Sequence, residues 1–515
     1  MTSLPGLPHR RLHVWPNSVT PMIPVMWTVG LGLWGLSRQD SVWRDEAATW
    51  QVAERSTAEI CHLLGNVDVV HGCYYLLMHG LFVCFGASTT TLRLPSVLAM
   101  AVAAGCVAVI GHRLADRWVG LAGGMALGLL PAVQFYLQEG RPYALVAAGA
   151  GIATWLLVHL LDGRDNRPAY GTWAAYGGTL LMCALLNWLA LLILPAHLAT
   201  LLWTRAGRGV WTRWAVTSAA ATAGALPLIL FSRGQSEQVS WIPPLTWHML
   251  IGPAILLLIG GVGAVLDRPR AGGRLSMTAV ALPLLAVPHL GLLGLSLIQP
   301  LFLDRYILFS LLGLALLIGT LIGSAVRAAR PRLPRASTWI LPTVIVMATA
   351  ALLPQSLAKR SPESRVDDVL AITSDIRRLK EPGNAVLFIP AARRDTQSVS
   401  PDAFTGLRDI ALARTPKKSG TLKGVEATPT RIRTAMLTHQ RILLVTDAPG
   451  AAKPPTAARD RTKLAVLKKY FTATADEQVR GRRLTVYERR PASAPHTEAP
   501  DLAGGRRDGR TGEGR

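Results

Sequence analysis

Two adjacent carboxylates stand in a short stretch flanked by tryptophans near the start of the chain. The stretch reads VWRDEAATW (42–50), and Asp45 and Glu46 follow Arg44 directly. A carboxylate beside apolar tryptophans is partly desolvated, which suits it to accept a proton as a general base. Acids are equally expected in the first turn of a helix, where they favour the positive N-terminus. The stretch therefore predicts a reactive base, with a helix cap as the alternative.

Other groups that could bind a charged substrate lie where later apolar runs begin or end. Arg141 and Arg305 are two such groups. An arginine at the edge of a membrane span is costly unless it is paired, and a guanidinium binds a phosphate through two parallel hydrogen bonds. Both residues are therefore candidate phosphate ligands, with ordinary interfacial arginines as the alternative. His71 is a candidate metal ligand or substrate hydrogen-bond donor, although a lone histidine is more often neither.

The elements that must position these groups are membrane helices. The chain has 515 residues, half of them hydrophobic, and a mean hydropathy of +0.31, which is too apolar for one ordinary soluble domain. Runs of spanning length recur up to residue 354. We expect eleven spans, at 21–37, 92–112, 118–137, 142–161, 169–186, 188–203, 214–231, 248–266, 277–298, 306–325 and 337–354. No small-residue cleavage site follows the first span, so we interpret it as an anchor and not a signal peptide.

Arginines in the connecting loops predict the orientation. With a cytoplasmic N-terminus, sixteen arginines before residue 355 fall inside and seven fall outside. This distribution agrees with the positive-inside rule. We therefore expect a multi-pass protein of the cell membrane, with its C-terminal region and the loop carrying Asp45 on the outer side.

The first outer loop, 38–91, is long and only partly polar. Its residues Ala47–Leu64 can form an amphipathic helix, whereas Tyr74–Phe85 is apolar but too short to span and should lie in the membrane interface. Such a loop would build a roofed cleft with Asp45 at its entrance. Cys61 and Cys73 share this loop and could form a disulfide, but the sequence does not decide whether they do.

The remainder of the chain divides into 1–354 as a transmembrane domain, 355–490 as a small outer α/β domain and 491–515 as a disordered tail. Helices are expected at Arg365–Lys380 and Ala457–Lys469. Strands are expected at 385–390, 441–447 and 483–489, the last of them at a sheet edge. No glycine-rich phosphate loop follows the first two strands, so we assign this domain no cofactor.

The chain is strongly basic, with a net charge of +23. The excess is +10 before residue 355 and +13 after it. A basic balance can indicate nucleic acid, but the outward-facing topology argues against that partner. Anionic lipid or a cell-wall polymer is the plainer interpretation.

Several motifs together resemble the GT-C glycosyltransferases, in particular family 39, the protein-mannosyltransferase-like group. The similarity rests on W-x-DE in the first outer loop and on four later motifs at matching topological positions. Those four are DVVHGCYYLLMH (68–79), LRLPSVL (92–98), QEGRPYAL (138–145) and DRYILF (304–309). The resemblance covers roughly residues 20–354 and implies a membrane all-α, polytopic GT-C-like bundle.

The resemblance also implies a reaction. It predicts a sugar donor carried on polyprenyl phosphate, an acceptor on the outer side and inversion at the anomeric carbon, with mannose as the commonest sugar and arabinose-type donors as an alternative. Asp45 matches the family's first acid, the expected base. The matching motifs supply the expected substrate-binding residues, namely Glu46, His71, Tyr74, Glu139, Arg141, Tyr143, Arg305 and Tyr306.

Two of these residues keep alternatives. Glu46 could bind a divalent cation, the only cofactor expected, or could orient an arginine, or could be a plain first-turn acid. Glu139 could simply balance the charge of Arg141.

The loop 232–248 could cover the acceptor or could belong to an interfacial aromatic belt.

The acceptor itself, whether protein, glycolipid or wall glycan, is not readable from the sequence. A transporter or flippase of a lipid-linked saccharide is the main rival function, and a polymer-binding scaffold is the second. The transporter predicts charged residues near the middle of the helices, and the apolar runs hold almost none.

Overall fold

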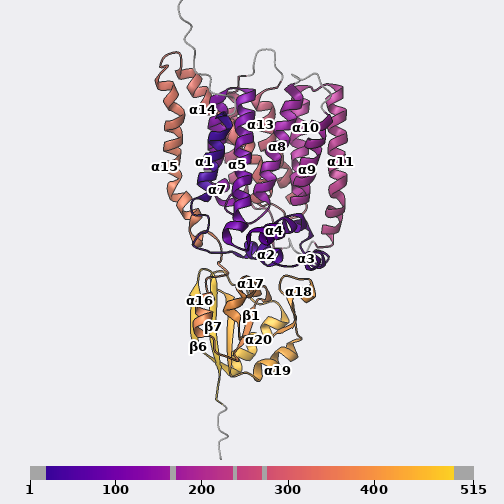
Figure 1. Ribbon diagram of the computed structural model, residues 1–515, viewed down its shortest axis with the longest axis vertical. Helices are drawn as coiled ribbons and strands as arrows, with labels where there is room; N and C mark the ends of the chain where they lie inside the picture. Colours follow the sequence, from indigo (N-terminus) through magenta and orange to yellow (C-terminus); the bar gives the residue numbers. More distant parts are fainter. Residues whose placement is uncertain (1–18, 163–169, 236–240, 269–274, 492–515) are drawn as a thin grey trace, which may run out of the picture.

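The computed structural model describes residues 19–162, 170–235, 241–268 and 275–491. It contains a bundle of roughly parallel helices, a layer of short helices at one end of the bundle and a mixed α/β domain beyond that layer (Figure 1). The bundle is formed by α1 (Val19–Leu33), α5 (Thr89–Leu114), α6 (Arg117–Leu129), α8 (Tyr143–Asp162), α9 (Tyr170–Leu186), α10 (Ile193–Thr204), α11 (Arg208–Arg233), α12 (His248–Val265), α13 (Met277–Ser296), α14 (Leu311–Ala329) and α15 (Ile340–Arg360).

Seven helical segments in the described part of the chain are long and apolar enough to cross a membrane. Shorter apolar helices accompany them, so the expected count of eleven spans stays a prediction. The segment containing α14 is the most enclosed, with 78% of its apolar window buried, against 17% for α11, α12 and α15. Helices α5, α6 and α14 pack so closely that a methyl group at Gly120 would lie 2.3 Å from the Ala108 carbonyl oxygen. The peripheral helices leave apolar side chains exposed, as lipid-facing helices do.

The short helices of the outer layer come mostly from the first long loop. They are α2 (Arg44–Ala53), α3 (Thr57–Leu64), η1 (Val69–His71) and α4 (Gly72–Phe85), joined by α7 (Pro131–Tyr136) and η4 (Asp304–Ser310). The single helix expected over Ala47–Leu64 is wrong, because Ser56 and Glu59 form a capping box that starts α3 afresh. Helix α4 has 14 residues, as the short apolar segment predicted. Cys61 and Cys73 are both free thiols, so the possible disulfide does not form.

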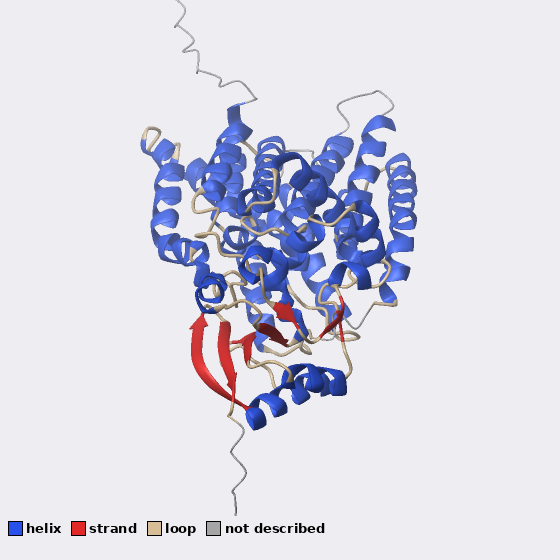
Figure 2. Ribbon diagram, turned by 60° about the horizontal axis from the view of Figure 1, so that its bottom comes forward, coloured by secondary structure: helices blue, strands red, loops and turns tan. Residues whose placement is uncertain are grey.

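The C-terminal domain has a five-stranded sheet in the order β2-β1-β5-β7-β6. Its elements are η6 (Pro362–Ser364), α16 (Thr373–Leu379), β1 (Ala385–Ile389), α17 (Asp395–Val399), β2 (Arg408–Asp409), β3 (Leu412–Arg414), α18 (Pro416–Ser419), β4 (Val425–Glu426), α19 (Pro429–Leu437), β5 (Arg441–Asp447), α20 (Ala458–Tyr470), β6 (Phe471–Val479) and β7 (Arg482–Arg489). Strands β2, β1 and β5 are parallel, and β7 and β6 are antiparallel. Figure 2 shows these strands gathered in this domain below the helices.

Three expectations for this region change. The strand at 483–489 is internal, because the polar strand β6 pairs along its outer edge. The helix expected over Arg365–Lys380 is confined to α16, because residues 365–369 make contacts with the outer layer instead. The boundary expected at residue 354 falls inside α15, which continues to Arg360. The disordered tail predicted from Pro491 lies almost wholly outside the described residues.

Candidate active site

Asp45 lies in the first turn of α2 and reaches the far part of the chain. Its Oδ2 accepts a hydrogen bond of 2.9 Å from Nη1 of Arg305, 260 residues later. The side chains of Asp45 and Arg305 are 23% and 13% exposed, so the pair is sheltered but accessible. Asp45 does not cap α2: the N-cap position is Trp43, which makes no side-chain cap bond. The structure thus brings together two residues that the sequence assigned to one site.

Aromatic rings surround the Arg305 guanidinium. Its central carbon lies 5.7 Å from the ring centre of Tyr143, 5.5 Å from Trp241 and 5.8 Å from Tyr306. Rings at this range attract a cation and hold its plane. The Nε atom of Arg305 is buried and has no hydrogen-bond partner among the described residues. Arg305 is therefore oriented by rings and by Asp45, with donor capacity left over.

A second polar chain joins Arg141 to the short helix η1. Nη2 of Arg141 lies 3.2 Å from Nε2 of His71. On the other side of the ring, Nδ1 of His71 lies 2.9 Å from Oδ1 of Asp68. Since a guanidinium can only donate, Nε2 accepts and the Nδ1 proton is donated to Asp68. Burial, with Arg141 adding to it, lowers the pKa of His71, so the ring is neutral at pH 7. Tyr75 completes the chain by donating its hydroxyl to Asp68.

Arg141 also contacts the backbone of the first site. Its Nη1 donates to the Asp45 carbonyl oxygen at 3.4 Å, and its Nε is buried without a partner among the described residues. Both candidate phosphate arginines therefore approach Asp45, one at its side chain and one at its backbone. Phosphate binding by either arginine stays a prediction.

A cavity of about 540 Å³ lies next to these groups. His71, Tyr143 and Tyr306 line it, so it reaches the histidine that contacts Arg141 and two of the rings around Arg305. Asp45, Arg141 and Arg305 are not among its lining residues. Its other polar lining residues are Asn187, Ser232, Arg233, Gln235 and Gln299, and its apolar lining includes Leu186, Trp188, Leu189 and Leu301. A cavity with both kinds of lining can take a molecule with a charged head and an apolar tail.

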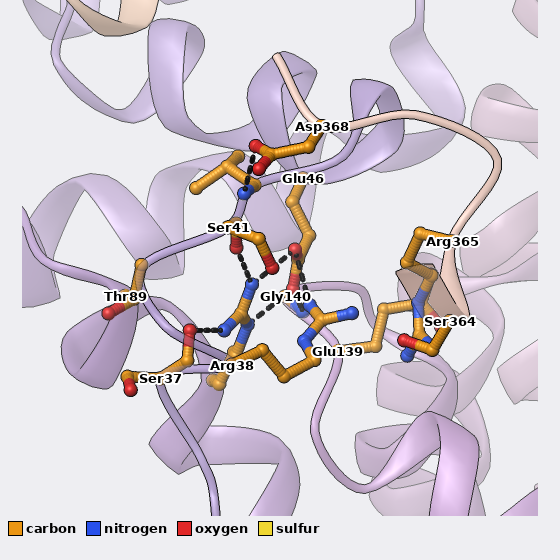
Figure 3. Close-up of polar contacts among 12 residues, drawn as sticks. Ser37, Arg38, Ser41, Glu46, Thr89, Glu139, Gly140, Ser364, Arg365 and Asp368 are labelled. Carbon is orange, nitrogen blue, oxygen red and sulfur yellow. Dashed lines mark hydrogen bonds and ion pairs between the residues drawn. The ribbon is translucent and has the colours of Figure 1, made fainter. Parts of the chain in front are cut away.

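Glu46 is a correction to the predicted site. Its side chain is fully buried and points into a cluster of arginines (Figure 3). Arg93 donates to both of its oxygens, at 2.8 and 2.7 Å, and Arg38 donates to Oε2 at 2.7 Å. The Gly140 amide adds a bond of 3.0 Å to Oε1. Burial alone would raise the pKa of Glu46, but Arg38 and Arg93 outweigh it and lower the pKa to about 2. Both oxygens are occupied by arginine and amide donors, so the contacts match the alternative that Glu46 orients an arginine.

Tyr74 and Glu139 also depart from expectation. Tyr74 is fully buried in the core of the bundle, and its neighbour Tyr75 makes the polar contact instead. Glu139 does not balance Arg141: both of its oxygens are buried without a hydrogen-bond partner among the described residues. Burial, offset in part by Arg365, raises the pKa of Glu139 to about 7.

Sequence reasoning missed part of the cavity wall. Asn187 ends α9 and caps the short helix that begins at Trp188, since its side chain accepts a bond from the Leu189 amide. A polar residue that interrupts two apolar runs at their outer end was the available signal. Arg233 at the end of α11 was counted only for topology, although it also lines the cavity.

No set of three or more histidine, cysteine, aspartate or glutamate residues stands together as a metal site in the described part of the chain. The expected divalent cation was assigned to Glu46, whose oxygens are taken by guanidinium groups. The cation therefore stays a prediction, without a ligand set among these residues.

Comparison with known proteins shows the fold. No family model and no curated protein matches the chain. The crystal structure of ArnT from Cupriavidus metallidurans in the apo state is similar, with a TM-score of 0.59 at 13% identity, covering 92% of this chain and 98% of ArnT. The structure of the same ArnT bound to undecaprenyl phosphate gives a TM-score of 0.54 at 13% identity, covering 91% and 98%. The chain thus shares the fold of ArnT over nearly its whole length, and its apolar helices are those of a multi-pass membrane protein.

Proposed function

We propose that this protein is a glycosyltransferase that moves a sugar from a polyprenyl-phosphate donor to a hydroxyl group on the outer side of the cell membrane, with inversion. The observation that carries the proposal is the Asp45–Arg305 pair. Two of the rings around Arg305, Tyr143 and Tyr306, line a cavity that has both polar and apolar lining residues. The similar ArnT fold, seen with undecaprenyl phosphate bound, supports the same class of donor.

The cavity walls suggest how the donor lies. Leu186, Trp188 and Leu189 offer an apolar surface for the first prenyl units, close to the outer ends of α9 and α10. Arg233 and His71 line the polar part, and Arg141 stands behind His71. The phosphate would be held by Arg141, Arg233 and Arg305, which keep their charge at any physiological pH.

Asp45 is the proposed base. The acceptor oxygen attacks the anomeric carbon while its proton passes to the Asp45 carboxylate. The bond from the anomeric carbon to the phosphate oxygen breaks on the opposite face, and the phosphate leaves with the electron pair. Arginines beside the leaving phosphate stabilise the charge that develops there. One displacement of this kind inverts the anomeric centre.

Sugar, acceptor and orientation belong to the same proposal. Mannose is the first sugar to test, because the sequence motifs resemble those of the mannosyltransferase-like group, and a pentose donor is the second. The acceptor is a protein, glycolipid or wall glycan of the cell envelope. The arginine distribution supports an N-terminus in the cytoplasm and a C-terminal domain outside. A reporter that works only in the cytoplasm can be fused after residue 360. Activity of that fusion would overturn this orientation.

The decisive experiment incubates the purified protein with a panel of polyprenyl-phosphate sugars and measures release of polyprenyl phosphate. Asp45→Asn should lower turnover ~10²–10⁴-fold, the usual cost of losing a general base. Its affinity for undecaprenyl phosphate should stay near that of the parent. Glu54→Gln is the matched control, because Glu54 follows the same helix but lines a different cavity. The proposal fails if no donor is consumed, or if Asp45→Asn turns over like the parent.

A further inference from the structure

The N-terminus of α2, the helix that carries Asp45, is held by a residue of the C-terminal domain. The first amides of a helix lack partners within it, and the N-cap residue Trp43 has no side-chain oxygen to accept from them. Asp367 fills this place: its Oδ1 accepts from the Arg44 amide at 3.2 Å. Its Oδ2 accepts from Nε of Arg44, also at 3.2 Å. The cap of α2 thus comes from a residue 323 positions away in the sequence.

Asp367 is itself fixed from behind. Nη2 of Arg482 donates to Oδ2 of Asp367 at 3.0 Å, and Arg482 also binds both oxygens of Asp395 at 2.8 and 2.7 Å. Arg482 and Asp367 are both buried. Asp395 begins α17, which packs against α2. The cap is therefore part of a charged network that is anchored on strand β7.

A parallel set of contacts holds Val42, two residues before the helix begins. The Val42 amide donates to Oδ1 of Asp368 at 3.1 Å (Figure 3), and the Val369 amide donates to the Val42 carbonyl at 2.7 Å. Apolar side chains close the same junction, with Val42, Ala47, Val369 and Val399 buried together. Backbone and side-chain contacts thus fix α2 against the C-terminal domain on one side.

The first three residues of α2 contact three different parts of the molecule. Arg44 binds the C-terminal domain, Asp45 binds Arg305 and Glu46 binds the arginine cluster of the bundle. We propose that Asp367 is a positioning residue for Asp45, so that the C-terminal domain sets the place of the base in the active site. This inference rests on the proposed function of Asp45 and gives the C-terminal domain a task in that reaction.

The kinetic test replaces Asp367 by alanine and by asparagine. Asp367→Ala removes the cap but leaves Arg482 its two bonds to Asp395, so the domain keeps its buried charge pair. Turnover should fall by about 10-fold or more, since small displacements of a reacting group are costly. The KM for the polyprenyl-phosphate donor should stay within about twofold, because Asp367 does not line the donor cavity. Asp367→Asn should recover most of the turnover, because asparagine caps helices about as well as aspartate.

Hydrogen exchange provides a test that needs no activity. In Asp367→Ala, exchange in the segment 42–53 should become faster, while exchange in α5 stays unchanged. Asp476→Ala is the matched control, because it removes an Asp–Arg pair from the exposed strand β6 of the same domain. Parental exchange in 42–53 of Asp367→Ala would overturn the inference whatever the reaction proves to be. It would also be overturned if donor KM and turnover changed together, or if Asp476→Ala behaved like Asp367→Ala.

Discussion

Asp45 and Glu46 are neighbours in the sequence but belong to different regions of the molecule. Asp45 is 23% exposed and holds one arginine at the edge of a cavity. Glu46 is 0% exposed and is bound by two arginines and a backbone amide. Successive residues of a helix point about 100° apart, so one turn of α2 can serve two sites. A pair of adjacent acids is therefore not evidence for a shared task.

The Glu46 region joins separate segments of the chain. Arg93 comes from α5, Arg38 from the turn after α1 and Gly140 from the turn before α8. Arg93 also donates to the carbonyl oxygens of Leu36, Ser37 and Ser41. Glu46 is the carboxylate that compensates these buried cations. In the Asp45 region, in contrast, Arg305 keeps a buried Nε without a hydrogen-bond partner among the described residues, and its neighbouring rings line a cavity.

The largest effect that tests this contrast is the loss of Glu46. Glu46→Ala leaves Arg38 and Arg93 buried without their carboxylate, which should cost about 3–5 kcal/mol of unfolding free energy. Thermal unfolding in detergent should show a marked loss of stability or no folded protein. Asp375→Ala breaks an exposed pair with Arg378 and should change stability by less than about 1 kcal/mol. Parental stability of Glu46→Ala would refute the structural assignment.

The sequence predicted the two charged groups of the active site better than their surroundings. Arg305 and Asp45 share a site because each stands at the outer end of an apolar run, and topology alone places such ends together. The role of Glu46 depended on which arginines fold against it, and periodicity does not reveal that. Tyr74 was predicted in place of Tyr75 because the sequence does not show which of two adjacent rings, both buried here, points its hydroxyl at Asp68.

The C-terminal domain shows the same limit. Strands β1 and β5 were predicted because both are continuous apolar runs, whereas β6 was missed because its side chains are mostly polar and exposed. The helix predicted from Arg365 does not begin there, because Asp367 and Asp368 are engaged with α2. Contacts between distant segments outweighed local helix preference in that stretch.

Glu139 offers a third carboxylate that sharpens the comparison, because it is buried like Glu46 but its oxygens have no hydrogen-bond partner among the described residues. Its pKa is about 7 in the folded protein, against an ordinary value of 4.5. The folded state then binds more protons, so stability should fall as pH rises from about 4.5 through 7. Glu139→Gln should remove this dependence and stabilise the protein at pH 8 by up to about 3 kcal/mol.

Unfolding of Glu139→Gln and the parent at pH 4.5 and pH 8 provides the measurement. The two proteins should be alike at the lower pH and differ at the higher one. Glu477→Gln, on the exposed strand β6, is the control and should show no such divergence. A gap of equal size at both pH values would mean that Glu139 is ionised throughout.

Arg305 tests the other side of the comparison. Arg305→Lys keeps the charge but loses the planar guanidinium that Tyr143, Trp241 and Tyr306 surround. Donor use, measured as kcat/KM, should fall about 10-fold, which corresponds to about 1.4 kcal/mol. Arg233→Lys gives a comparison at an arginine that lines the cavity directly. If both lysine variants use donor as the parent does, these arginines do not bind the phosphate.

The smallest effect concerns the stability of Asp45→Asn. A first-turn acid gains about 0.3–1 kcal/mol from the positive end of its helix, and its half-sheltered pair with Arg305 adds a similarly small amount. Asparagine keeps the shape, and the α2 cap comes from Asp367, so the variant should lose no more than about 1 kcal/mol of unfolding free energy. Unfolding curves of Asp45→Asn and Glu46→Gln, recorded side by side in one detergent, measure the difference. A small loss for Asp45 and a large loss for Glu46 would separate reaction from structure at adjacent residues. Equal losses would mean that Asp45 also holds the fold together, and a fall in its turnover could then no longer be assigned to the missing base.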